Sequence, residues 1–144
     1  MKLLCFLFAI AILVTPSCKE NQNKDEDGVI TNCYSKVDRD TIALMTKTLG
    51  DSVLTGLLRY KWFEKDENVG TIRGVFRGDT LFAEYNFRSE GLESTREVVF
   101  LKKGNLLIEG IGKVEVSGSH QYFVNPKEIK FNSGIELAEG DCDH

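Results

Sequence analysis

The stretch TIRGVFRGDTLFAEYNFR, residues 71–88, consists of two runs of alternating side chains on either side of a Gly-Asp pair. Ile72 and Phe76 lie on one face of the first run, and Tyr85 and Phe87 lie on one face of the second. A period of two is typical of a β-strand with one buried face. Because so short a turn joins antiparallel neighbours, this stretch predicts a β-hairpin.

The same alternation continues on both sides of this hairpin and is interrupted by turn residues at regular intervals. Short loops between successive strands indicate an antiparallel meander. The predicted strands cover residues 41–49, 53–63, 71–77, 80–88, 95–102 and 106–116, with two weaker ones at 128–131 and 134–138. No convincing helix is visible. The sequence therefore predicts an all-β fold of about eight strands.

Glycines on the predicted inner face favour a small calycin-like barrel. Gly56, Gly74, Gly110 and Gly112 occupy positions where a β-branched residue would normally pack better. Glycine permits sharp coiling, and closure of about eight strands removes exposed edges. The alternative is a two-sheet sandwich in which these glycines relieve crowding. In residues 53–63 the predicted inner face consists of Leu54, Gly56, Leu58, Tyr60 and Trp62.

The first 17 residues have the layout of a secretory signal peptide. Lys2 is their only charged residue, and residues 3–14 form an unbroken apolar run. A membrane-spanning helix needs roughly 20 apolar residues. We therefore expect residues 1–17 to be removed on export.

The junction VTPSC, residues 14–18, resembles the relaxed lipobox of Bacteroidota-type lipoproteins. The resemblance implies that Cys18 receives fatty acyl chains such as palmitate and becomes the first mature residue. The partner of the protein would then be the membrane, reached through this lipid anchor. The alternative is ordinary signal-peptidase cleavage, which would leave Cys18 as a thiol.

A charged segment follows Cys18. Of residues 19–27, six are charged and three are Asn or Gln, so nothing there can bury apolar area to offset the entropy of ordering. We expect residues 18–32 to be the lipidated cysteine and a disordered tether, and residues 33–144 to be a β-barrel-like domain. Acidic residues soon after the cysteine resemble a surface-export signal. The expected location is the outer membrane, at its periplasmic face or the cell surface.

Cys33 and Cys142 lie near the two ends of the predicted domain. An even pair in an exported domain predicts a disulfide, because the compartment is oxidising. The alternative is two unpaired thiols near the ends of the domain.

The charge balance and the motifs limit the function classes. Without its first 17 residues the chain carries 17 basic and 22 acidic side chains, a net charge of −5, and no dense basic block. This argues against a nucleic-acid partner. No catalytic, metal-binding or cofactor-binding motif is recognisable, so we expect that the protein binds no cofactor and has no enzymatic activity. A pair of glycosidase carboxylates could lie anywhere in a sheet without forming a recognisable sequence motif.

Five aromatic side chains share the predicted inner face of three adjacent strands. A barrel could use them to line a ligand cavity, or they could fill its interior as ordinary core. They are Tyr60, Trp62, Phe76, Tyr85 and Phe87.

Two resemblances bear on function. Segments 56–60, 64–74, 78–85, 89–91 and 96–98 resemble a family of small uncharacterised Bacteroidota lipoproteins, which implies a lipid-anchored β domain and no known activity. SGSHQY at 117–122 and FNSG at 131–134 are similar to two loops of the membrane-bound inhibitors of C-type lysozyme, which implies a protein partner. The favoured expectation is a non-catalytic module that binds a small apolar or glycan ligand or supports the envelope. An inhibitor and an unrecognised carbohydrate-acting enzyme are the alternatives.

Overall fold

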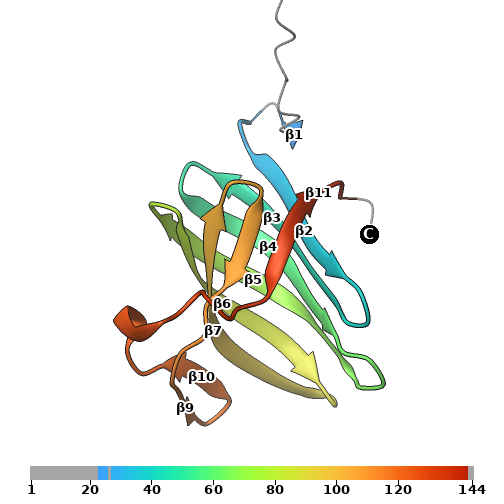
Figure 1. Cartoon of the computed structure of the whole chain (residues 1–144), viewed down its shortest axis with the longest axis vertical. Helices are drawn as coiled ribbons and strands as arrows, with labels where there is room; N and C mark the ends of the chain where they lie inside the picture. Colours follow the sequence, from blue (N-terminus) through green and yellow to red (C-terminus); the bar gives the residue numbers. More distant parts are fainter. Residues whose placement is uncertain (1–22, 26, 143–144) are drawn as a thin grey trace, which may run out of the picture.

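Eight antiparallel strands close into a barrel in the computed structural model, which describes residues 23–25 and 27–142 (Figure 1). The order around the barrel is β6-β5-β4-β3-β2-β11-β8-β7, and β7 pairs with β6 to close it. The all-β barrel prediction is thus confirmed, and the sandwich alternative is wrong. The strands are β2 (Ile30–Val37), β3 (Thr41–Leu49), β4 (Ser52–Lys61), β5 (Glu67–Arg77), β6 (Thr80–Ser89), β7 (Leu92–Lys103), β8 (Leu106–Glu109) and β11 (Glu136–Gly140).

Three short strands lie outside the ring. β1 (Asn23–Lys24) pairs with the start of β2. β9 (Val114–Ser117) and β10 (His120–Phe123) form a hairpin, and β10 runs parallel to β7 at Thr95 and Arg96. In Figure 1, β1 and this hairpin lie at opposite ends of the long axis of the molecule. In the part of the chain that the structure describes, no helix has the length and hydrophobicity needed to cross a membrane.

The segment predicted as a disordered tether is partly ordered. It contains β1, and β2 already begins at Ile30, three residues before the expected domain boundary. Gly28 takes a φ of 79° in the turn between them, and the Thr48 hydroxyl donates a 3.2 Å hydrogen bond to the carbonyl of Ile30. Pairing with β3 therefore extends β2 toward the N-terminus. The signal peptide prediction for residues 1–17 and the lipidation of Cys18 lie outside the described residues.

The predicted strand 106–116 is wrong, because the chain leaves the barrel wall after Glu109. Gly110 and Gly112, which were expected to let a strand coil, instead lie against side chains of the segment that crosses the outside of the barrel. A Cβ on Gly110 would be 2.5 Å from Ile129, and one on Gly112 would be 3.0 Å from Phe123. Residues 128–131 do not form a strand either: Glu128 ends a 3-10 helix, η1 (Pro126–Glu128), and Lys130 contributes a single bridge to Ile111.

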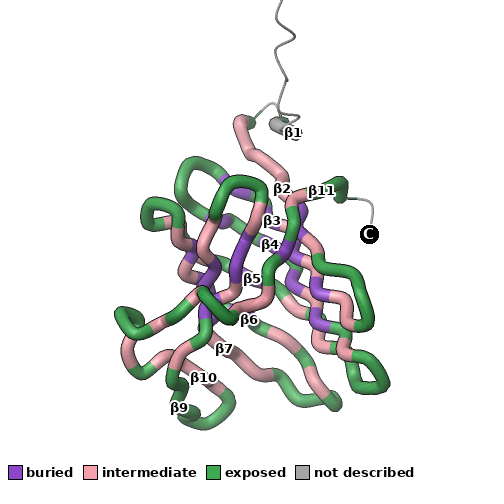
Figure 2. The backbone as a smooth tube through the Cα atoms, in the orientation of Figure 1, coloured by how far each residue is buried: buried purple, intermediate pink, exposed green. Residues whose placement is uncertain are grey.

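The barrel is filled by apolar side chains that alternate inward along its strands, and Figure 2 shows exposed turns at both ends. One strand departs from the predicted alternation. A β-bulge in β4 between Val53 and Gly56 shifts the register, so Val53 is buried and Leu54 is 46% exposed. The core consists of Tyr34, Ile42, Leu44, Val53, Leu58, Tyr60, Ile72, Leu81, Ala83, Tyr85, Val98, Phe100, Leu107 and Leu137.

Close strand packing explains Gly74, one of the two inner glycines of β5. A Cβ on Gly74 would lie 2.2 Å from the carbonyl oxygen of Phe82 and 2.7 Å from Cα of Ala83. Only glycine allows β6 to approach β5 so closely, as the sharp coil of a small barrel requires.

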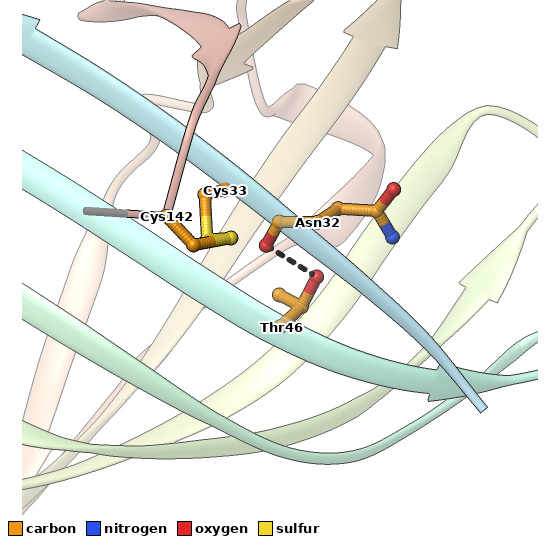
Figure 3. Close-up of a disulfide and its surroundings, with 4 residues drawn as sticks. All are labelled: Asn32, Cys33, Thr46 and Cys142. Carbon is orange, nitrogen blue, oxygen red and sulfur yellow. Dashed lines mark hydrogen bonds between the residues drawn. A yellow bond between two sulfur atoms is a disulfide. The ribbon is translucent and has the colours of Figure 1, made fainter. Parts of the chain in front are cut away.

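A disulfide joins Cys33 of β2 to Cys142, just beyond β11, as predicted (Figure 3). The two Cα atoms are 5.2 Å apart, and the cysteines are 109 residues apart in the sequence. Beside the disulfide, the Thr46 hydroxyl reaches the carbonyl of Asn32 at 3.5 Å. The bond links the first and last strands of the barrel, which are already paired.

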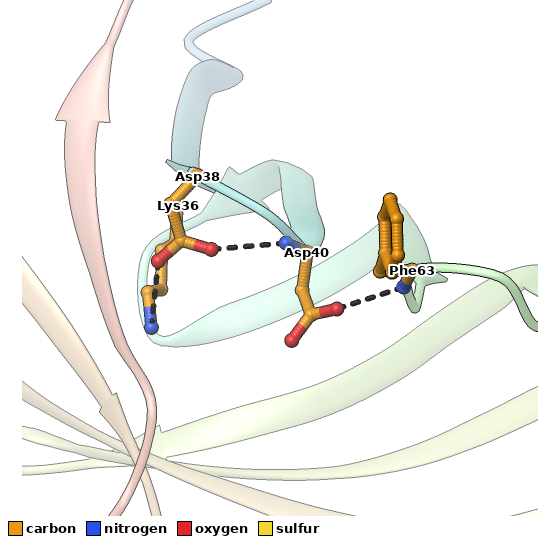
Figure 4. A network of polar contacts seen from close by, with 4 residues as sticks. All are labelled: Lys36, Asp38, Asp40 and Phe63. Atoms are coloured by element: carbon orange, nitrogen blue, oxygen red, sulfur yellow. Dashed lines mark hydrogen bonds and ion pairs between the residues drawn. The ribbon is translucent and has the colours of Figure 1, made fainter.

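The turn between β2 and β3 is held by two aspartates (Figure 4). The amide of Asp40 donates a 2.9 Å hydrogen bond to Asp38, and Asp38 pairs with Lys36 at 3.3 Å. The backbone hydrogen bond from Asp40 is the largest cause of a lowered pKa of Asp38, and Lys36 lowers that pKa further. Asp40 accepts a 2.8 Å hydrogen bond from the amide of Phe63. The turn is thereby fastened to the end of β4.

Candidate functional site

A cluster of polar side chains lies inside the barrel near the ends of β4 and β8. Arg96 on β7 is paired with Tyr85 on β6, and Glu109 on β8 is paired with Phe100 on β7. Directly paired residues project to the same face of a sheet. Because Tyr85 and Phe100 are fully buried, the two charged side chains project inward as well.

Glu109 accepts a 2.6 Å hydrogen bond from the Tyr60 hydroxyl, which reaches it from β4. The same carboxylate oxygen lies 3.7 Å from Nη2 of Arg96. An ion pair of this length falls outside hydrogen-bonding distance. The carboxylate is therefore held mainly by the tyrosine, and the guanidinium is left with weak contact to its counter-ion.

The Arg96 guanidinium is packed against three aromatic rings. Its Cζ is 4.6 Å from the ring centroid of Tyr60, 5.4 Å from that of Tyr85 and 5.9 Å from that of Phe87. Cations within about 6 Å of an aromatic centroid are attracted to the ring face. The aromatic cluster thus fixes the position of the arginine.

Burial shifts the titration of three groups in this cluster. It raises the pKa of Glu109, and the hydrogen bond from Tyr60 and the charge of Arg96 oppose that rise. It also raises the pKa of Tyr60, with a further rise from the Glu109 charge, and raises the pKa of Tyr85 to about 12. Both phenols therefore keep their protons at neutral pH and can act as hydrogen-bond donors.

Two donors in the cluster have no partner among the described residues. They are the Tyr85 hydroxyl and Nε of Arg96, and both atoms are buried. Leaving a buried donor unpaired costs about 1–3 kcal/mol. Most buried polar groups in native proteins are paired with protein or water, so these two donors mark a place where another molecule could bind.

An open cleft leads from the surface to this cluster. Its volume is about 240 Å³, and its lining includes Arg96, Glu109 and Gln121. It lies where β8 ends and the chain leaves the barrel wall. The side chain of Arg96 is 29% exposed and that of Glu109 is 17% exposed. A small molecule in the cleft could therefore touch both charged groups.

Four of the five predicted aromatics meet in this region. Tyr60 stacks on Trp62 at 6.0 Å, Tyr85 stacks on Phe87 at 4.7 Å, and the two tyrosines are 5.9 Å apart. Tyr60 and Tyr85 belong to the core, and the other three pack against it. Phe76 lies near the other end of β5, at the turn into β6. The aromatics therefore fill the barrel as core, and none of the five is among the residues that line the cleft.

The sequence pattern did not identify Arg96 or Glu109 as site residues, and it indicated Gln121 only as a member of the loop at 117–122. The strand around Arg96 reads REVVFL. Because its apolar residues occupy both faces, the pattern does not indicate which side chains point into the barrel. The reason is that Val98 faces the interior while the equally buried Val99 faces the crossing segment outside. The available signal was the spacing: Arg96 lies two positions before Val98 and four before Phe100, and therefore on the same face of the strand.

Of the two loops predicted to resemble those of lysozyme inhibitors, the first contributes Gln121 to the lining of the cleft. Residues 117–122 include the turn of the β9–β10 hairpin, where Gly118 has a φ of 62°. Residues 131–134 lead toward β11. Among residues 23–25 and 27–142, no three His, Cys, Asp or Glu side chains lie close enough together to hold a metal ion.

No protein-family model, curated protein or solved structure matches the chain.

Proposed function

We propose that this protein is a non-catalytic binding module of a Gram-negative envelope and that its ligand binds in the cleft at Arg96. The carrying observation is the open cleft lined by Arg96, whose Nε has no hydrogen-bond partner among the described residues. Sites for small ligands typically combine an apolar wall with a few well-placed polar groups. Apolar side chains such as Val98 and Phe123 provide the wall, and Arg96, Glu109 and Gln121 provide polar groups.

The lining of the cleft favours a ligand with oxygen atoms over a purely apolar one. Nε of Arg96 is an unpartnered hydrogen-bond donor, and an apolar ligand would leave it unsatisfied. Gln121 adds an amide that can donate and accept. A glycan or another small oxygen-bearing molecule fits these requirements.

The proposed location rests on the N-terminal sequence and the disulfide. The signal peptide and the lipobox-like junction favour a lipid anchor on Cys18, and the disulfide is typical of an oxidising compartment. β10, which contributes Gln121, lies far from β1 along the long axis (Figure 1). A chain anchored before β1 would therefore direct its cleft away from the membrane.

Native mass spectrometry of the protein purified from its own envelope tests both parts of the proposal. We expect acyl chains on Cys18 and a small molecule that stays bound to the wild-type protein. The Arg96→Ala variant should lose this molecule. Arg88→Ala is the matched control, because Arg88 is 67% exposed and pairs only with Glu93 among its described ion pairs.

A ligand retained equally by all three proteins would contradict the assignment of the cleft, and its absence from the wild-type protein would contradict the binding function. The anchor has its own test, metabolic labelling with a palmitate analogue. Failure to label the protein, with labelling of other lipoproteins in the same cells, would contradict lipidation of Cys18.

A further inference from the structure

We propose that the ligand of this cleft carries a carboxylate and that this carboxylate binds the Arg96 guanidinium in preference to Glu109. The inference rests on the proposed binding function and names the chemical class of the ligand.

The first argument is that the guanidinium lacks a good internal partner. Its ion pair with Glu109 is 3.7 Å long, and its Nε has no hydrogen-bond partner among the described residues. Arginine presents several N–H donors in a planar fork that matches both oxygens of a carboxylate. Glu109 does not use that fork, because its nearest oxygen accepts the hydrogen bond of Tyr60 and lies 3.7 Å from Nη2 of Arg96.

The second argument is that the arginine is held in place before any ligand arrives. The rings of Tyr60, Tyr85 and Phe87 surround it at 4.6 to 5.9 Å. A charged side chain already held in position loses less conformational entropy on binding than a mobile one. Since it is also 29% exposed, a ligand can reach it from the cleft.

The charge of Glu109 is the main obstacle to an anion, and its surroundings reduce that obstacle. The groups that face Glu109 are Tyr60 from β4 and Arg96 from β7. Burial raises the pKa of Glu109, so protonation of this carboxyl is easier than in water. An arriving carboxylate would favour the protonated form, which leaves the positive charge of Arg96 uncompensated within the pair.

The test compares carboxylates with uncharged counterparts of nearly the same shape. The lipidated protein in lipid nanodiscs is titrated with glucuronate against glucose, octanoate against octanamide, and N-acetylalanine against its amide. These pairs represent a sugar acid, a fatty acid and a peptide C-terminus. Fluorescence of Trp62, the only tryptophan of the chain, is the reporter, because its ring stacks on Tyr60 at 6.0 Å.

We expect at least one carboxylate to bind about tenfold or more tightly than its uncharged counterpart. Arg96→Gln should abolish that preference, and the control Arg88→Gln should keep it. Glu109→Gln should increase the affinity for the carboxylate, because the competing negative charge is gone. A purely structural role of Glu109 would not produce such a gain.

Equal affinity within every pair, or no carboxylate binding at millimolar concentration, would overturn the inference. If a neutral sugar binds and Arg96→Gln weakens it, the binding function stands and only the carboxylate assignment falls. If native mass spectrometry also finds no retained molecule, the binding function falls too. An unchanged preference in a folded Arg96→Gln variant would equally contradict the assignment.

Discussion

The Tyr60 hydroxyl donates a 2.6 Å hydrogen bond to Glu109, which lies 49 residues further along the chain. The bond connects β4 to β8 across the interior of the barrel, since these strands are not neighbours in the ring. It leaves Tyr85, in the same cluster, with a hydroxyl that has no partner among the described residues. The ring centroids of the two tyrosines are 5.9 Å apart and both residues are buried, yet only one of the hydroxyls has a partner among the described residues.

These two tyrosines make a matched pair of variants. Tyr60→Phe removes a hydrogen bond to a buried carboxyl group, so we expect the free energy of unfolding to fall by about 1–3 kcal/mol. Tyr85→Phe removes a hydroxyl without a partner, so its stability should be unchanged or slightly higher. Urea unfolding followed by circular dichroism measures both. Equal losses in the two variants would show that the Tyr85 hydroxyl is paired after all.

Periodicity predicted the barrel wherever one face of a strand is buried and the other is exposed. The strands around residues 41–49, 71–77 and 80–88 agree with β3, β5 and β6 to within a few residues. It failed where packing between distant segments decides the structure. Residues 110–131 leave the wall to cover the outside of the barrel, and no local pattern predicts that crossing.

The candidate site was predicted only in its apolar half. The aromatics were found because Tyr60, Tyr85 and Phe87 follow a clear alternation on their strands. Arg96 and Glu109 were missed because β7 is buried on both faces and β8 is only four residues long. A charged residue on an inner face contradicts the hydrophobic pattern, and such local conflicts are typical of functional sites.

Gly74, one of the two inner glycines of β5, yields a second matched pair of variants. In Gly74→Ala the new methyl group would lie 2.2 Å from the carbonyl oxygen of Phe82, so β5 and β6 must separate. We expect a loss of about 1–3 kcal/mol or more. The control is Gly140→Ala, because a Cβ there has no atom within 4 Å and no positive φ to strain. A Gly74→Ala variant as stable as this control in thermal unfolding would contradict the close approach of the two strands.

The disulfide should contribute much of the stability of this small domain. Replacing both cysteines, as in Cys33→Ser with Cys142→Ser, should lower the free energy of unfolding by about 2–5 kcal/mol, because the bond closes a loop of more than 100 residues. Dithiothreitol should destabilise the wild-type protein similarly and leave the double variant unchanged. Stability that does not respond to either change would rule out a stabilising role for the bond.

A count of free thiols tests the disulfide and the lipid anchor together. In unfolded, unreduced protein from the envelope we expect none, because Cys33 and Cys142 are joined and Cys18 is acylated. One thiol would instead indicate ordinary cleavage before an unmodified Cys18. Two or more would contradict the disulfide.

Glu109 should give the stability of the protein a specific pH dependence. Burial is the main cause of its raised pKa, so between the ordinary glutamate value, about 4.3, and the raised value the folded protein binds more protons than the unfolded chain. Its contribution to the free energy of unfolding therefore falls as pH rises through that window. The groups facing it, Tyr60 and Arg96, reduce this effect without reversing it.

Glu109→Gln isolates this contribution, because glutamine keeps an acceptor for the Tyr60 hydroxyl and does not titrate. Subtracting the unfolding free energies of wild type and variant cancels the other carboxyl groups. The difference should move in favour of the variant as pH rises above about 4.3 and level off above the raised pKa. Glu115→Gln is the control, since Glu115 lies on the exposed hairpin and its contact to Tyr122 is 3.3 Å long. A difference for Glu109→Gln that is constant with pH, like that of the control, would show that the carboxyl group titrates normally in the barrel.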